Sequence, residues 1–584
     1  MKKLSVILLV VMLLAACVGV AESNLFTPGT YEGSAPGFHG PVNVTVEVSE
    51  NAVTRVTVGE NSETWHIGDL AFPVLEESIV ENQSLADVVS GATFTSRAIN
   101  SAVAKALESA GASAETIDAM KAAPVACVNP GDTETDVVVI GAGVAGMVAA
   151  AQAKEAGADV ILLEKSSMAG GSARYSAGAV LFVGIPEMEE FGFDAEDVHR
   201  WINIASGPIL NDDNFYKLVN GTKETYDFVH KNGYEIGFIG MNQPKLAPIF
   251  RLSFTKNFGT GVADQTLNGV LKNDIDLRYN TKAASLIQAA DGTIEGVVAE
   301  NAAGTYEIHA KKVILATGGF SYNKEMLEKY APDWTTNTFT LSFPGTVGDG
   351  HEMGVAAGGT LVGDGVLQIY TAGYDPRLFG NMPGNVALFV DSKGHQFCAM
   401  DEYYGTISPK IIELEDKIAW GIFSSDAVYV EIDRETSNFA VSDMEAYVAA
   451  GKAVKADTIE ELAEKIKVDP QELVRSVEEH NWYCDLGIND RWGTAAEALQ
   501  PIHTAPYYAM RETASVMGTI TGLKVDTDMR VLNANDEPIP NLYAVGELIF
   551  GNYFNGYYPM SGTAIGTAMT SGRFAGQHAA ESIR

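Results

Sequence analysis

Cysteine and positive charge are both scarce in this chain of 584 residues. Its four cysteines are spaced neither as a metal site nor as a disulfide framework. The motif Cys-x-x-Cys-His is absent, which excludes a c-type haem attached in the usual way. Lysine and arginine number 39 against 75 acidic residues, so the net charge is −36. This charge repels phosphate, and nucleic acid is therefore not an expected partner.

Long apolar runs are also few, and the clearest one lies at the N-terminus. Lys2 and Lys3 precede an apolar stretch, Leu4–Leu14, that is too short to span a bilayer. The sequence Leu-Ala-Ala-Cys that ends at Cys17 has the form of a bacterial lipobox. We interpret residues 1–24 as a lipoprotein signal peptide and tether, with lipid on Cys17. The alternative is an ordinary signal peptide with a chance cysteine. Either reading predicts an extracytoplasmic protein, and the first places it at the cell membrane.

The length of the chain indicates several domains, and residues 25–112 have an organisation of their own. Apolar and polar residues alternate over 42–58 as in a β-hairpin, and residues 67–79 and 96–110 suit helices. We therefore predict a small α+β domain here. Residues 113–133 are rich in alanine and contain Pro124, Pro130 and Gly131 without a sustained strand period, which is typical of a linker.

The tetrapeptide Ser-Gly-Ala-Thr ends at Thr93, just before the second of these helices. With the hairpin, it resembles the FMN-binding domains of sodium pumps and extracellular reductases. The resemblance implies that a flavin transferase esterifies FMN covalently onto the Thr93 hydroxyl, with Gly91 allowing close approach of the phosphate. A link through Thr95 is the minor alternative. Both threonines could instead simply cap the helix.

A glycine-rich turn follows the linker. The apolar strand 136–140 leads into Gly141-x-Gly143-x-x-Gly146, then a helix through Gln152. A second strand, 159–163, ends at Glu164. The glycines permit a tight turn and close approach of a pyrophosphate, and the acid can bind ribose hydroxyls. The order of strand, helix, strand and acid predicts a Rossmann-like α/β domain that binds FAD non-covalently.

Three further glycine motifs, around Gly171, Gly318 and Gly546, complete a pattern that resembles the FAD domains of the fumarate reductase superfamily. The superfamily includes two-flavin extracytoplasmic reductases, urocanate reductases and 3-ketosteroid dehydrogenases. The resemblance implies an α/β FAD domain in two parts, 134–353 and 507–584, split by an α+β capping domain at 354–506. It implies these FAD contacts: Gly141, Gly143, Ala145, Gly146, Glu164, Lys165, Gly171, Ser172, Thr317, Gly318, Glu547, Thr563 and Ala564.

The dicarboxylate site of fumarate reductases is not preserved. Where that family has two histidines and two arginines, this chain has Tyr370, Gln396, Met517-Gly518 and Pro559. A buried dicarboxylate needs cationic partners to offset its desolvation, so fumarate is a poor candidate substrate. Arg511 could supply one positive charge for a monocarboxylate, or it could be a surface residue.

The segment that begins at Tyr558 resembles a motif of 3-ketosteroid Δ1-dehydrogenases. The resemblance implies that the Tyr558 hydroxyl and the Gly562 amide hold a ketone oxygen, although Met560 and Ser561 depart from the motif. Alternatively, these two residues only pack against the flavin. A tyrosine would protonate the substrate. The candidates are Tyr370, Tyr403 and Tyr404.

The sequence therefore predicts a flavin-dependent reductase of an activated C=C bond in a small unsaturated carbonyl compound, with a steroid-like enone as the leading substrate. Electrons would come from a membrane donor, quinone- or NADH-linked, through FMN to FAD in anaerobic metabolism. One alternative is a reductase of an unsaturated carboxylate of the cinnamate or urocanate type. The other is a non-catalytic flavin electron shuttle.

Overall fold

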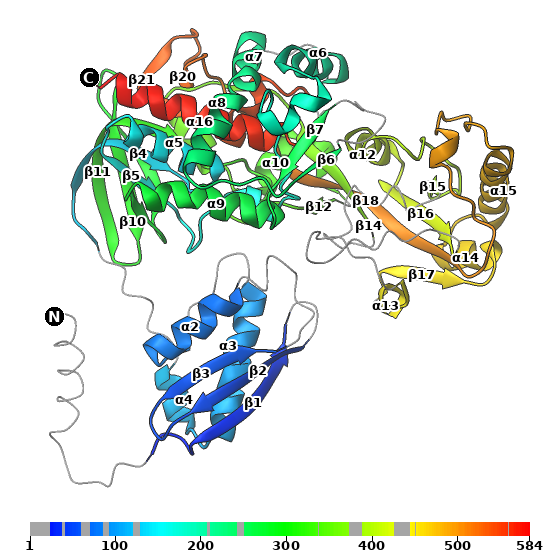
Figure 1. The fold of residues 1–584 in the computed structure, drawn as a ribbon, viewed down its shortest axis with the longest axis horizontal. Helices are drawn as coiled ribbons and strands as arrows, with labels where there is room; N and C mark the ends of the chain where they lie inside the picture. The colour runs from blue at the N-terminus through cyan, green and yellow to red at the C-terminus, as the bar shows by residue number, and fades with distance from the viewer. Residues whose placement is uncertain are drawn as a thin grey trace. The chain divides into compact units, whose positions relative to one another are not determined.

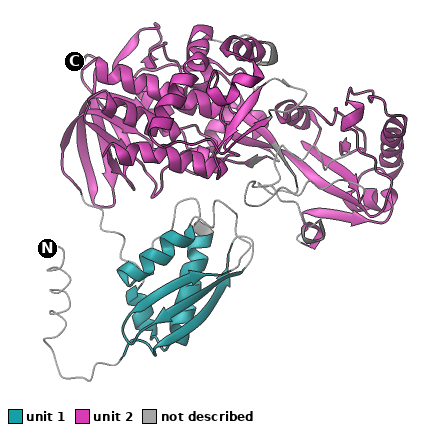
Figure 2. Cartoon of the chain, in the orientation of Figure 1, with its two compact units in different colours: residues 1–125 teal, residues 126–584 magenta. Residues whose placement is uncertain are grey.

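The chain divides into two compact units, residues 1–125 and 126–584 (Figure 2). Cys17 and residues 90–92 lie outside the described residues, as do the side chains of Thr93 and Tyr370. The predictions that concern their structure therefore stay predictions. The computed structural model describes residues 24–37, 41–59, 71–85, 93–120, 129–206, 211–241, 250–336, 338–372, 388–425, 444–449, 451–556, 558 and 560–583.

Unit 1 is a three-stranded antiparallel sheet packed on helices (Figure 1). Its strands are β1 (Gly29–Pro36), β2 (Pro41–Val48) and β3 (Val53–Val58), and its helices are α2 (Ala71–Asn82), α3 (Thr93–Ser109) and α4 (Ala114–Met120). The predicted hairpin is β2–β3. A Cβ at Gly33 would lie 1.9 Å from the Ala102 carbonyl oxygen, so glycine lets α3 approach β1 closely.

Helix α4 corrects the predicted linker. Residues 114–120 form a helix that buries Ile117 and Met120, and the Leu85 amide donates to the Met120 carbonyl at 2.5 Å. Two buried side chains in seven residues give too short a pattern to reveal a helix by periodicity. The first unit therefore continues through this helix.

Unit 2 contains the predicted α/β sheet. Its strand order is β20-β21-β11-β4-β5-β8, and β9 and β10 extend it beside β11. Strands β4, β5, β8, β11 and β21 run parallel where they pair, as a doubly wound fold requires. The bounds are β4 (Thr133–Ile140), β5 (Val160–Leu163), β8 (Asp276–Arg278), β9 (Lys282–Gln288), β10 (Ile294–Asn301), β11 (Gly304–Leu315), β20 (Arg530–Leu532) and β21 (Pro538–Ala544).

Helices α5 (Val144–Glu155) and α16 (Thr563–Glu581) pack closely against each other. A Cβ at Gly572 or Gly576 would lie 2.2 or 2.3 Å from a carbonyl oxygen of α5, so these glycines permit the contact. Helix α5 follows the glycine turn as predicted and extends three residues beyond Gln152. The other elements around this sheet are η1 (Gly171–Tyr175), α6 (Ala195–Ser206), α7 (Asp212–Asn220), α8 (Thr222–Lys231), β6 (Phe238–Met241), β7 (Arg251–Phe254), α9 (Phe258–Lys272), α10 (Lys324–Tyr330), α11 (Asp349–Ala356) and η5 (Gly546–Asn552).

A second sheet occupies the region predicted as the capping domain. Strand β18 (Tyr507–Thr519) is its centre, although it begins where the sequence predicts the return to the FAD domain. Helices α14 (Ile459–Ile466) and α15 (Pro470–Leu486) pack against each other in the same region. The remaining elements are β12 (Phe339–Thr340), β13 (Leu361–Val362), β14 (Val366–Ala372), β15 (Leu388–Val390), α12 (Tyr404–Glu413), β16 (Ile418–Ser424), α13 (Met444–Ala449), β17 (Ala453–Ala456) and β19 (Gly522–Leu523).

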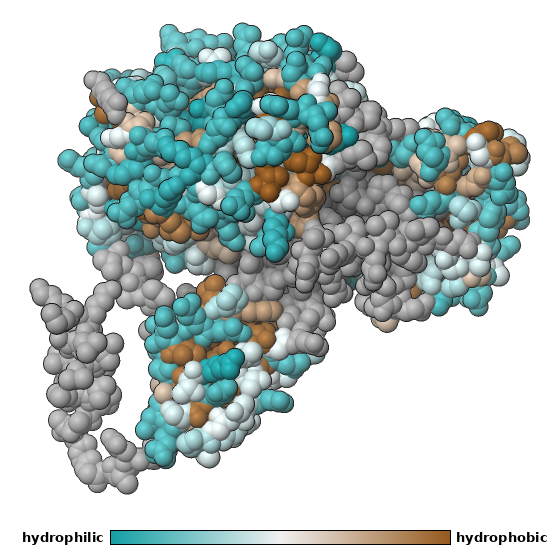
Figure 3. All heavy atoms as spheres, viewed as in Figure 1, coloured by the Kyte–Doolittle hydropathy of each residue, from teal (hydrophilic) through white to brown (hydrophobic). Residues whose placement is uncertain are grey.

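The visible face of unit 2 is mostly hydrophilic (Figure 3), in keeping with the high net charge. In the part of the chain that the structure describes, no helix has the length and apolar character needed to cross a membrane. The same part contains no cluster of histidine, cysteine and acidic side chains that could hold a metal ion.

One buried carboxyl group in the capping sheet should make the free energy of unfolding depend on pH. Glu512 lies on β18 between Ala372 and Ala419 of the neighbouring strands, and it is fully buried. Neither carboxyl oxygen has a hydrogen-bond partner in the described structure. Burial raises the pKa of Glu512 well above its ordinary value of 4.5, so the folded chain keeps the group neutral where the unfolded chain ionises it. Stability is therefore lost as the pH rises above about 4.5, towards the raised pKa.

Glu512→Gln should remove this pH dependence. We expect a melting temperature a few °C higher than wild type at pH 7 to 8, and little difference near pH 4. Thermal unfolding across this pH range measures the effect. Glu413→Gln, at an exposed position of α12, is the matched control and should behave like wild type. Equal melting temperatures for Glu512→Gln and wild type at every pH would contradict the account.

Candidate active site

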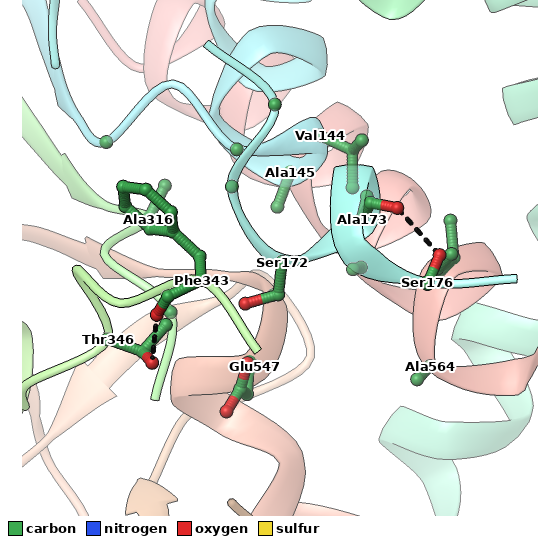
Figure 4. Close-up of a pocket in the computed structure, with 18 of the residues that line it drawn as sticks. Val144, Ala145, Ser172, Ala173, Ser176, Ala316, Phe343, Thr346, Glu547 and Ala564 are labelled. Atoms are coloured by element: carbon green, nitrogen blue, oxygen red, sulfur yellow. Dashed lines mark hydrogen bonds between the residues drawn. The ribbon is translucent and has the colours of Figure 1, made fainter. Parts of the chain in front are cut away.

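A large cavity lies at the carboxyl ends of the parallel strands in unit 2, where doubly wound folds bind nucleotides. It has about 1720 Å³ of empty space, which includes solvent on its open side. Its walls come from the β4–α5 turn, η1, β7, the start of α16 and η5. Figure 4 shows part of this wall, with Ala145, Ser172, Glu547 and Ala564 contributed by different segments.

The glycine turn leaves free space for a ligand on one side of the cavity. Gly141 has φ +104°, and a Cβ at Gly146 would lie 1.9 Å from the Gly141 carbonyl oxygen, so both positions need glycine. Gly143 differs, because a Cβ there would meet no atom within 4 Å. This free space lies at the N-terminus of α5, whose amides attract an anion. The turn therefore fits a pyrophosphate.

Charged side chains line the cavity beyond this turn. The Glu164 carboxylate is buried and accepts hydrogen bonds from the Ala142 and Ser166 amides at 2.9 and 2.8 Å. Lys165 and Lys282 both pair with Asp349, at 2.5 and 3.3 Å. Glu164 and Lys165 directly follow the second strand, β5, whereas Lys282 begins β9 and Asp349 begins α11. The acid after β5 marks the end of the cavity where a ribose and a base would bind.

Polar groups continue along the cavity towards η5. Glu547 is half-buried and accepts a hydrogen bond from the Thr519 amide at 2.8 Å. Burial raises the pKa of Glu547 to about 7. The Ser172 and Ser342 hydroxyls lie 2.9 Å apart. The buried Thr317 Oγ1 has no partner in the described structure, although Thr317 lines the cavity. Such an orphaned hydroxyl fits a cavity that holds a polar cofactor.

Hydroxyl groups converge at the start of α16. The Tyr404 hydroxyl and Ser561 Oγ lie 2.6 Å apart, and both residues line the cavity. The Tyr558 hydroxyl accepts a hydrogen bond from the Ala564 amide at 3.2 Å. Burial raises the pKa values of Tyr404 and Tyr558, so both phenols are neutral at physiological pH. This end of the cavity thus offers neutral donors.

Gln368 fixes the backbone behind these hydroxyls. Its Oε1 accepts a hydrogen bond from the Tyr558 amide at 2.8 Å, and its Nε2 donates to the Gly405 carbonyl at 2.9 Å. Because Gly405 follows Tyr404 on α12, the buried Gln368 side chain links the segments that carry the two tyrosines. Tyr403 packs beside Tyr404, with ring centroids 4.1 Å apart, and it does not line the cavity.

Comparison with known proteins identifies the chain. Residues 136–565 match the FAD binding domain family, and residues 37–108 match the FMN-binding domain family. A urocanate reductase of Eggerthella lenta is 33% identical over 97% of this chain and 96% of that protein. The chain belongs to the family of two-flavin reductases. Its cofactors are FAD and FMN, as the sequence predicts.

Two other relatives support this assignment. A vinyl phenol reductase of Lactiplantibacillus plantarum is 29% identical over 76% of this chain and 96% of that protein. A flavocytochrome c3 fumarate reductase in an open conformation is similar in structure, with a TM-score of 0.65 and 27% identity over 77% of this chain and 79% of that one. These relatives are named as reductases, and urocanate, vinyl phenol and fumarate each offer a C=C bond. This two-flavin reductase is therefore an oxidoreductase of C=C bonds, which leaves the electron-shuttle alternative without support.

The structure brings most predicted FAD contacts of this two-flavin reductase to one cavity. Gly146 lies inside the turn, and the Thr563 hydroxyl donates to the Met560 carbonyl at 2.7 Å, so neither lines it. Four further residues line the cavity and were not predicted from the sequence, because no local motif marks them: Lys282, Phe343, Leu252 and Phe254. The predicted contacts that do line it are Gly141, Gly143, Ala145, Glu164, Lys165, Gly171, Ser172, Thr317, Gly318, Glu547 and Ala564.

The predicted catalytic residues are only partly assembled. Tyr558, Gly562 and Tyr404 line the cavity, Tyr403 lies behind it, and Tyr370 is placed only by its backbone on β14, opposite Ala514.

The replaced fumarate anchors do not rebuild a dicarboxylate site in this two-flavin reductase. Gln396 donates to the Asp490 carboxylate at 3.0 Å and does not line the cavity. Arg511 is half-buried on β18, opposite Trp420, and also does not line it. Among the described lining residues, the only lysines or arginines are Lys165 and Lys282, both paired with Asp349.

Gly143→Val should weaken FAD binding without harming the fold. Gly143 has φ −70° and ψ 173°, which valine adopts readily, and its side chain would extend into free space. We expect at least about tenfold weaker FAD binding and an unchanged melting temperature of the apoprotein. Flavin titration and thermal unfolding measure the two effects. Gly146→Ala is the contrast, because the added Cβ clashes within the turn. This variant should lower both the FAD affinity and the melting temperature of the apoprotein. Wild-type FAD affinity in Gly143→Val would contradict the assignment.

Proposed function

We propose that this two-flavin reductase reduces a C=C bond conjugated to one carbonyl or one carboxylate group, and that fumarate is not its substrate. The observation that carries the proposal is the Tyr404–Ser561 hydroxyl pair beside the start of α16. Neutral hydroxyls and helix amides can hold one carboxylate or ketone oxygen. A second carboxylate would need a cation that the described lining does not offer at this end.

The residues at the start of α16 have distinct parts in this proposal. FAD, when bound, supplies the hydride chemistry. The Gly562 amide and the Tyr558 hydroxyl donate hydrogen bonds to the substrate oxygen, where negative charge develops as hydride arrives at the β-carbon. The Ala564 amide, which donates to Tyr558, makes that hydroxyl a stronger donor.

Tyr404 supplies the proton. Its hydroxyl passes a proton to the α-carbon, and the resulting oxygen regains one through Ser561, 2.6 Å away. Hydride and proton together give the saturated product. Turnover in D₂O should therefore place one deuterium on the α-carbon, as NMR of the product can show. A product without deuterium there would contradict proton delivery from an exchangeable group.

Two substrate classes fit this site. The unsaturated carboxylates, of the urocanate or cinnamate type, are favoured by the named activities of the relatives. The steroid-like enone is the second candidate, because Tyr558 and Gly562 lie together at the cavity as the ketosteroid motif requires.

The cellular setting is also part of the proposal. A membrane electron donor, quinone- or NADH-linked, reduces the protein, a flavin transferase attaches FMN, and lipid on Cys17 anchors it outside the cytoplasm. Two acyl chains on one residue suffice for stable anchoring.

Cys17→Ser should release the protein from the membrane fraction or leave it unprocessed. Fractionation followed by immunoblotting measures this, with Cys484→Ser as the control that should stay membrane-bound. An unchanged membrane fraction for Cys17→Ser would contradict lipid anchoring.

A further inference from the structure

The β6–β7 hairpin supplies an apolar wall of the cavity. Leu252 and Phe254 alternate along β7, so they share one face, and both line the cavity. A Cβ built on Gly562 would lie 2.7 Å from Leu252 Cδ2, which shows how closely this wall approaches the start of α16. The wall therefore extends from the donor hydroxyls along the same cavity.

The Phe254 ring has a fixed orientation. It stacks on Phe238 with ring centroids 4.8 Å apart and an interplanar angle of 4°, and Phe258 meets it at 68°. A Cβ at Gly240 would lie 2.8 Å from Phe254 Cε2, so glycine leaves room for the ring. Phe238 pairs with Phe254 across the hairpin and is 40% exposed. An apolar area lies near this hairpin in Figure 3.

We propose that Leu252 and Phe254 recognise a flat aromatic ring attached to the C=C bond, with Phe238 as a positioning residue. The proposal rests on the proposed function and names the part of the substrate that the hydroxyl groups do not hold. The Phe254 ring is already held in one orientation, so it can contact the edge or the face of a planar ligand at little cost in side-chain entropy. A methyl group in place of the ligand's ring would make few of these contacts.

Cinnamate and crotonate test this recognition, because they share the reacting C=C–carboxylate and differ in phenyl against methyl. In Phe254→Leu we expect the cinnamate-to-crotonate ratio of kcat/KM to fall about three- to tenfold, mostly through the KM of cinnamate. Phe238→Ala should give a smaller fall in the same direction. Trp482→Leu, an exposed aromatic residue on α15, is the control and should keep the wild-type ratio.

Ligand binding tests the proposal without turnover. The saturated products, 3-phenylpropanoate and butanoate, are titrated into the oxidised holoenzyme, and the flavin absorbance change gives their dissociation constants. Weaker binding of 3-phenylpropanoate alone in Phe254→Leu is expected, with unchanged FAD content. Equal losses for both ligands, a lowered FAD content or no change in the binding ratio would overturn the proposal. Failure to reduce any unsaturated acid, together with the expected binding result, would overturn only the proposed function.

Discussion

Thr93→Ala is expected to abolish covalent flavin while leaving FAD bound. Helix α3 begins at Thr93, so the first amides of a 17-residue helix lie where the phosphate of an esterified FMN would be. Thr95, the alternative acceptor, is only 3% exposed, and so its hydroxyl is poorly placed for a transferase. Protein made with a flavin transferase should lose its fluorescent band in a denaturing gel. Reduction of substrate by a one-electron dye should then fall to background.

Thr95→Ser is the matched control, because it keeps a hydroxyl in the same helix and should retain the fluorescent band. FAD released by denaturation should be equal in the two variants and wild type. A fluorescent band that persists in Thr93→Ala would move the attachment site elsewhere.

Tyr404→Phe is expected to lower kcat by about a hundred- to ten-thousandfold, the usual range for loss of a general acid. The change removes the hydroxyl paired with Ser561 and keeps the ring that lines the cavity. KM and FAD content should change little, because the lost interaction acts in proton transfer. Steady-state kinetics under anaerobic conditions measures the effect.

Tyr403→Phe is the control for this prediction. Tyr403 lies beside Tyr404 but does not line the cavity, so this variant should keep most of the activity. Wild-type turnover in Tyr404→Phe would remove that tyrosine from the mechanism and leave Tyr370 as the candidate donor.

Local motifs explain what the sequence could predict. The glycine turn at 141–146 is contiguous in the sequence, and Glu164 follows it after one helix and one strand. Each of these residues has a fixed place in a known β-α-β unit. The structure therefore brings Gly143, Glu164 and Glu547 to one cavity as predicted.

Long-range packing explains what the sequence could not predict. Tyr404 and Ser561 are 157 residues apart, and their contact depends on α12 packing beside the start of α16. The stack of Phe238 on Phe254 depends on the register of a hairpin that no turn motif marks. Strand β18 lies on the expected boundary between two domains and joins the capping sheet through ladder pairs that span up to 176 residues, as between Phe339 and Ser515.

The choice of substrate shows the same limit. The motif at Tyr558 led to a steroid-like enone as the first prediction, whereas the named activities of the relatives favour unsaturated carboxylates. A short motif gives the groups at one end of a cavity, but the remaining walls come from residues such as Leu252 and Phe254. The proposal of an aromatic monocarboxylate uses both parts.

The most direct test is reoxidation of the reduced holoenzyme by candidate substrates. Protein reduced anaerobically with dithionite is mixed with cinnamate, urocanate, a cyclic enone or fumarate, and the return of flavin absorbance is followed. The account predicts rapid reoxidation by an aromatic monocarboxylate and background rates with fumarate, because the described cavity lining offers no cation for a second carboxylate at the reacting end. Rapid reoxidation by fumarate, with none by the monocarboxylates or the enone, would contradict it.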